Sequence, residues 1–245
     1  MTALYCVIDT EKAPTLPADG LPGAAPPRAL AIAGGLTAIV ATVPDEEYAP
    51  EAVEAKLRDM DWVSRAALGH ERVIEAAMQD AIAVLPMKLL TLFSGDARVM
   101  TDLARRRARL AKAAARVAHC QEYGLRITAR SDEAPRASGE RPSSGLAFLE
   151  RKKQVRDAAR ERAADQVTFA REAWEALSGA ARDAVQRPAA ADADERPLLD
   201  AAFLVGPEDR QAFAVASERL SEAAEAAGCV MTLTGPWPPY HFVQA

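Results

Sequence analysis

The feature that most constrains the fold of this chain is an alternation of short apolar runs with longer segments whose apolar residues recur at helical spacing. Short apolar or alternating runs are typical of strands, whereas apolar residues at i, i+3, i+4 and i+7 are typical of amphipathic helices. The strands expected on this basis lie at residues 4–8, 29–33, 36–43, 87–93, 122–129, 198–205 and 228–234. The pattern predicts an α+β fold.

The N-terminal half contains a proline-rich stretch, a glycine turn and three expected helices. Five prolines between residues 10 and 28 predict a loop without regular structure. The pair Gly34-Gly35 between two apolar runs predicts a β-hairpin. Three helices are expected at residues 51–68, at 73–85 before Pro86, and at 96–118. In the first of these, one face holds Val53, Leu57, Met60, Ser64 and Ala67.

The C-terminal half reads as β–α–β–α–β. Residues 122–129 alternate as a strand, residues 146–186 form one long helix, and a strand, a helix at 208–227 and a last strand follow. The charged, proline-bearing segment 131–144 is expected to be a flexible loop. This order predicts a split βαβ sheet with helices on one face. We therefore expect two α+β domains, at residues 1–118 and 119–245, with Trp174 as a packing anchor of the long helix.

Bulk properties exclude several classes of protein. The net charge is −5 over 245 residues, and a chain this acidic has no global electrostatic reason to bind nucleic acid or an anionic membrane. The three cysteines form no Cys-x-x-Cys pair, which favours a reducing compartment. The first residues lack a basic region of the kind that opens a signal peptide, and no apolar run is long enough to span a bilayer. A cytoplasmic protein is expected.

No constellation for catalysis is evident in the sequence. The three histidines, His70, His119 and His241, have no partner at metal-ligand spacing, and structural roles are expected for them. The glycines do not lead into a helix with the spacing of a phosphate-binding loop. Carboxylates are mixed with arginines on helix faces, where solvated ion pairs are expected. We predict no catalytic residue, no metal and no cofactor.

A basic stripe is the one local charge feature. Arg105, Arg109, Lys112 and Arg116 follow the spacing i, i+4, i+7 and i+11, so one continuous helix would place them on one face. The stripe has three interpretations: a solvated face opposite Leu103 and its apolar neighbours, a docking face for an acidic protein surface, or a nucleic-acid site. The third lacks interleaved aromatic residues.

The last residues form a stiff aromatic tail. Pro236, Pro238 and Pro239 hold the backbone extended around Trp237 and Tyr240. Because burial of a large aromatic side chain is worth roughly 2–3 kcal/mol, we expect Trp237 to pack on the C-terminal sheet or its neighbouring helix. The alternative is a tail that presents Trp237 and Tyr240 to a partner.

This tail, LTGPWPPYHF at residues 233–242, resembles the C-terminal signature of the GvpL/GvpF family of gas vesicle proteins. Further blocks agree with that family in order, with a Tyr where Trp is more usual at position 123. They are LTAIVATVP at 36–44, DWV at 61–63, HERVI at 70–74, VLPMK at 84–88, TLF at 91–93, EYGLR at 122–126 and AAFLV at 201–205. The resemblance spans nearly the whole chain and fits both F-type and L-type members.

The resemblance implies a two-domain protein with a ferredoxin-like C-terminal domain. It also implies an accessory or minor structural role in gas vesicle assembly, through contacts with the hydrophobic shell subunit and with other gas vesicle proteins, and no catalysis. The expected location is the cytoplasm, at the gas vesicle. Two alternatives stay open on the sequence: an enzyme on an α+β scaffold, and an RNA-binding sheet, for which Tyr123 is the candidate aromatic.

Overall fold

A computed structural model describes residues 1–32, 34–130, 145–188 and 197–243. Contacts divide the chain into two compact units. The first unit comprises Met1–Glu122 together with the segment from Pro236 to the C-terminus, and the second comprises Tyr123–Gly235. The predicted domain ranges, 1–118 and 119–245, differ from these units chiefly in the tail, which groups with the N-terminal unit.

The first unit is built around the central strand β1 (Thr2–Asp9), whose first seven residues are all buried. It pairs antiparallel with β3 (Leu36–Thr42) on one side, and with β4 (Ala83–Pro86) and β5 (Leu92–Phe93) on the other. Strand β2 (Arg28–Ala31) adds to β3 as the predicted hairpin. Gly34 and Gly35 have φ angles of 96° and 83°, which glycine adopts without strain. The buried strand and the hairpin are confirmed.

The helices of this unit begin and end at other residues than predicted. They are α1 (Asp45–Tyr48), α2 (Pro50–Lys56), α3 (Met60–Asp80), α4 (Asp96–Arg105) and α5 (Arg107–Val117). The single helix predicted at 51–68 is wrong. The Asp59 side chain accepts hydrogen bonds from the N–H groups of Asp61 and Trp62, so it caps a new helix there. As a result, Leu57 and Met60 are 48% and 69% exposed instead of lining a buried face.

Three further elements differ from the prediction. Helix α3 ends at Asp80. Residues 83–85 are predicted to complete a helix before Pro86, but residues 83–86 form β4 against Cys6–Asp9 of β1. The strand expected at 87–93 is reduced to Leu92–Phe93. The helix expected at 96–118 is divided at Arg106, whose φ and ψ of −96° and 5° leave the helical region.

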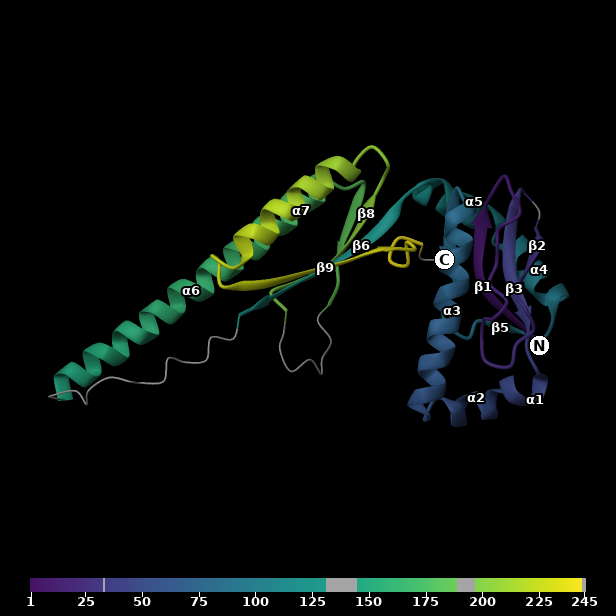
Figure 1. The fold of residues 1–245 in the computed structure, drawn as a ribbon, viewed down its shortest axis with the longest axis horizontal. Helices are drawn as coiled ribbons and strands as arrows, with labels where there is room; N and C mark the ends of the chain where they lie inside the picture. Colours follow the sequence, from purple (N-terminus) through teal and green to yellow (C-terminus); the bar gives the residue numbers. More distant parts are fainter. Residues whose placement is uncertain (33, 131–144, 189–196, 244–245) are drawn as a thin grey trace. The chain divides into compact units, whose positions relative to one another are not determined.

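The second unit has the order β6-α6-β7-β8-α7-β9, and its sheet has the strand order β7-β8-β6-β9. Figure 1 shows β6, β8 and β9 of this sheet together with α6 and α7. The elements are β6 (Gln121–Ala129), α6 (Gly145–Gly179), β7 (Asp183–Gln186), β8 (Leu199–Val205), α7 (Arg210–Ala224) and β9 (Cys229–Trp237). The predicted helix 146–186 ends early because β7 pairs antiparallel with β8. The strands expected at 122–129 and 198–205 are confirmed, and the loop expected at 131–144 lies outside the described residues.

An aromatic cluster joins both helices to one face of this sheet. The ring of Phe203 on β8 lies 5.7 Å from that of Trp174 on α6 and 5.6 Å from that of Phe213 on α7. Tyr123 on β6 lies 5.2 Å from Phe213, so it faces the helices. The expectation that Trp174 packs in the core is therefore confirmed. The other face of the sheet carries polar residues that include Arg126 and Asp200.

Candidate functional site

The aromatic tail is anchored within the first unit. The Tyr240 hydroxyl donates a hydrogen bond to Oε2 of Glu71 on α3 at 2.5 Å, and its ring packs against the core of that unit. Phe242 and Val243 are only 4% and 6% exposed. Trp237 is 39% exposed, so the prediction that Trp237 is buried against the C-terminal sheet is wrong. The residues that follow it provide the buried apolar surface of the tail instead.

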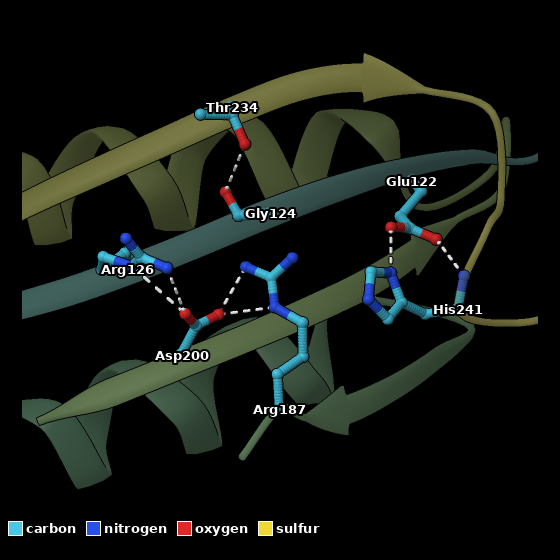
Figure 2. A network of polar contacts seen from close by, with 7 residues as sticks. All are labelled: Glu122, Gly124, Arg126, Arg187, Asp200, Thr234 and His241. Atoms are coloured by element: carbon cyan, nitrogen blue, oxygen red, sulfur yellow. Dashed lines mark hydrogen bonds and ion pairs between the residues drawn. The ribbon is translucent and has the colours of Figure 1, made fainter. Parts of the chain in front are cut away.

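A second anchor of the tail is the pair Glu122–His241 (Figure 2). The Glu122 side chain is 4% exposed. Its Oε2 accepts the backbone N–H of His241 at 2.8 Å, and its Oε1 lies 2.6 Å from Nδ1 of the same residue. A buried carboxylate needs such donors, because an unpaired one is costly to bury. The position of Glu122 therefore depends on the tail.

Burial shifts the pKa values of three side chains in the first unit, those of Glu71, Tyr240 and His70. Burial raises the pKa of Glu71, and nearby Glu75 adds to that effect while the Tyr240 hydrogen bond opposes it. Burial and the Glu71 carboxylate raise the pKa of Tyr240, so its hydroxyl stays a donor. Burial also lowers the pKa of His70, whose Nε2 lies 3.0 Å from the Met87 carbonyl oxygen. A neutral, buried His70 fits the structural role predicted for it.

The open face of the second sheet carries an arginine clamp, which we define as Arg126, Asp200 and Arg187 (Figure 2). The Asp200 side chain is 8% exposed, and each of its oxygens serves one arginine. Oδ2 accepts from Nε and Nη2 of Arg126 at 3.1 and 2.8 Å. Oδ1 lies 2.5 Å from both Nε and Nη2 of Arg187. The clamp thus joins β6, β8 and the residue that follows β7.

A small depression of about 260 Å³ lies beside the clamp. Its lining comprises Gly124, Leu125, Arg126, Arg187, Thr232 and Thr234. The Thr234 hydroxyl donates to the Gly124 carbonyl oxygen at 3.4 Å (Figure 2). No sequence pattern indicated the clamp: Arg126 belongs to the family block at 122–126, but its partner Asp200 is 74 residues away and outside the blocks that resemble the family.

The basic stripe does not lie on one helix. Arg105 belongs to α4, whereas Arg109, Lys112 and Arg116 belong to α5, because the helix breaks at Arg106. All four side chains are exposed. The prediction of one continuous helical face is therefore wrong, although the three residues of α5 still follow a common face.

Within the described residues, no group of three or more His, Cys, Asp or Glu side chains could hold a metal ion. In the same part of the chain, no helix has the length and apolar character that crossing a membrane requires. The aromatic residue that the RNA-binding alternative invoked, Tyr123, faces the helices rather than the open side of the sheet.

These features define a mixed α/β protein with two antiparallel sheets. Comparison with known proteins identifies it further. The family model of the gas vesicle synthesis protein GvpL/GvpF matches residues 2–244, and the chain belongs to this family. It is 32% identical over 232 residues to gas vesicle protein L from Streptomyces sp. (strain CB03234), an alignment that covers 90% of this chain and 84% of that protein.

Solved structures with the same fold agree with this assignment. The crystal structure of GvpF from Anabaena sp. PCC7120 matches with a TM-score of 0.71 at 17% identity, and the match covers 100% of this chain and 96% of that one. GvpF from Microcystis aeruginosa matches with a TM-score of 0.67 at 16% identity over 100% and 99% of the two chains. The whole described architecture is therefore shared with gas vesicle proteins.

Proposed function

We propose that this chain is an accessory or minor structural protein of gas vesicle assembly that binds the hydrophobic shell subunit and other gas vesicle proteins. The observation that carries the proposal is the family match over residues 2–244, which covers nearly all of the sequence. In this role the protein needs no catalytic site or cofactor. It acts in the cytoplasm at the growing vesicle.

We also propose that the two compact units are two domains and that the second is ferredoxin-like. The element order βαββαβ and the strand order β7-β8-β6-β9, with two helices on one face, support that description. A rigid sheet of this kind can present surfaces on its open face while the helices form the core with its other face.

Two of the predicted surfaces are candidates for partner binding. The exposed cations of α5, Arg109, Lys112 and Arg116, form the first, with Arg105 on α4 as a neighbour in sequence. The second is Trp237, which keeps 39% of its surface exposed at the end of β9. Tyr240, half-buried and bonded to Glu71, contributes by holding the tail in place.

The test is a pull-down of the shell subunit and of each accessory gas vesicle protein by the full chain. A triple reversal to Glu at Arg109, Lys112 and Arg116 should weaken one of these complexes. The matched control reverses three exposed arginines elsewhere, Arg65, Arg72 and Arg98, with the same change in charge. Binding of the parent should also decline with salt, since the Debye length falls from about 10 Å at 0.1 M to about 3 Å at 1 M.

The two possible negative results test different claims, one about the surface of α5 and one about the proposed function. If the triple reversal binds every partner as the parent does, then α5 is only a solvated face. If the parent captures no gas vesicle protein at all, the proposed function itself is refuted.

A further inference from the structure

We propose that the arginine clamp on the open sheet face binds a side-chain carboxylate from an extended acidic segment of a partner protein. The buried Asp200 carboxylate holds both guanidinium groups by their Nε and Nη2 atoms. A guanidinium group has five N–H donors, and this side-on mode leaves the end formed by Nη1 and Nη2 available. That end matches the two oxygens of a carboxylate in a bidentate pair.

The available donors have no acceptor in the part of the chain that the structure describes. Among the residues that the structure describes, no acceptor bonds to Nη1 of Arg126 or of Arg187. The Arg126 side chain is 62% exposed even though Asp200 fixes its position. Both arginines satisfy the buried Asp200 carboxylate, which needs such donors. Because Asp200 orders them before a partner arrives, the entropic cost of capturing a further anion is lower.

Gly124 keeps the floor of the depression open. A Cβ atom at this position would lie 2.8 Å from Thr234 Oγ1, and 3.5 and 3.7 Å from Nη2 and Nη1 of Arg187. The Arg187 guanidinium group therefore lies directly over strand β6 at the glycine. The depression, at about 260 Å³, falls below the roughly 300–1,000 Å³ of small-molecule sites but suffices for one acidic side chain.

The charge and composition of this face favour a protein over a nucleic acid. The clamp combines two cations and one anion, so it attracts a single carboxylate. Sheets that bind single-stranded RNA stack bases on exposed aromatic side chains. Here Tyr123, the aromatic residue of β6, faces the helices, while Thr232 and Thr234 border the depression. An acidic segment can place one side chain in the depression without needing a stacking platform.

The experiment measures binding of a fluorescein-labelled hexaglutamate peptide to the full chain by fluorescence anisotropy. It requires no gas vesicle component, so its outcome is independent of the proposed function. Arg126→Gln should weaken binding by about tenfold or more, the effect of losing one bidentate charged pair. Arg219→Gln is the matched control, since Arg219 is an exposed residue of α7, on the helix-covered side, and its loss changes the charge equally. Melting temperatures verify that both variants fold.

A second variant separates geometry from charge. Asp200→Asn makes the chain more positive by one unit, so non-specific attraction would tighten peptide binding. The clamp predicts the opposite, because the two guanidinium groups lose the carboxylate that orients them. Any of three results overturns the proposal: no binding of the peptide, equal effects of Arg126→Gln and Arg219→Gln, or tighter binding by Asp200→Asn. Preferential binding of poly(U) RNA that depends on Arg126 would assign the face to nucleic acid instead.

Discussion

Truncation of Phe242 tests whether the tail stabilises the first unit. The Phe242 side chain is 4% exposed, and replacing a buried phenylalanine by alanine costs roughly 3–5 kcal/mol. Because the segment from Pro236 onward groups with residues 1–122, Phe242→Ala should destabilise that unit and leave the second unit unchanged. With a urea dependence of roughly 2 kcal/mol per molar, the midpoint of unfolding should fall by about 2 M.

Tryptophan fluorescence can follow the two units separately. Trp62 lies in the core of the first unit and Trp174 packs against Phe203 in the second. Two single-tryptophan backgrounds, both with Trp237→Phe, therefore report one unit each during urea unfolding. Val230→Ala, which truncates a side chain on β9 that is 47% exposed, serves as control. It should change the free energy of unfolding of either unit by no more than about 0.5 kcal/mol. If Phe242→Ala lowers only the Trp174 midpoint, the tail belongs to the second unit.

Two more variants test local features. Since burial raises the pKa of Glu71, the folded chain binds that proton more tightly than the unfolded chain, and this carboxyl destabilises the fold as pH rises through its folded pKa. Glu71→Gln should therefore melt above the parent at pH 7 and converge with it near pH 4; a gap that widens in acid would contradict this. Gly69→Ala should lower the melting temperature because its Cβ would lie 2.1 Å from the Gly20 oxygen, whereas Gly179→Ala, with open space around it, should leave the melting temperature equal or higher. Equal effects of the two alanine variants would show that the loop at Gly20 adapts.

Sequence patterns predicted the elements whose local signals agree with their tertiary contacts. The apolar run at residues 4–8 and the Gly34-Gly35 hairpin are of this kind. The prediction for residues 83–85 was wrong because their apolar spacing also suits a helix, and only pairing with β1 makes them a strand. The break between helices near Asp59 was not predicted, for a different reason. The apolar periodicity continues through it, although the sequence contains the aspartate that caps the new helix.

The site was harder to predict because its contacts are long-range. Tyr240 and Glu71 are 169 residues apart, and His241 and Glu122 are 119 apart. Apolar periodicity indicates which face of an element is buried, but it does not indicate which distant carboxylate accepts hydrogen bonds from the tail. The strongest available signal was the chemistry of the tail itself, since a tyrosine hydroxyl and a histidine ring that become partly buried need acceptors.

The tail anchors explain why three separate blocks of the family resemblance contain polar residues. Glu71 lies in the block at 70–74, Glu122 in the block at 122–126, and their partners Tyr240 and His241 in the tail. Each carboxylate meets one tail residue, so two separate carboxylates of the first unit hold the tail. Replacement of one partner would leave a poorly solvated carboxylate, and such groups cost about 1–3 kcal/mol or more. Trp237 takes no part in either contact and keeps 39% of its surface exposed. Because Glu71 and Glu122 fix the tail three and four residues after Trp237, the tail can hold the Trp237 side chain in a defined position for a partner.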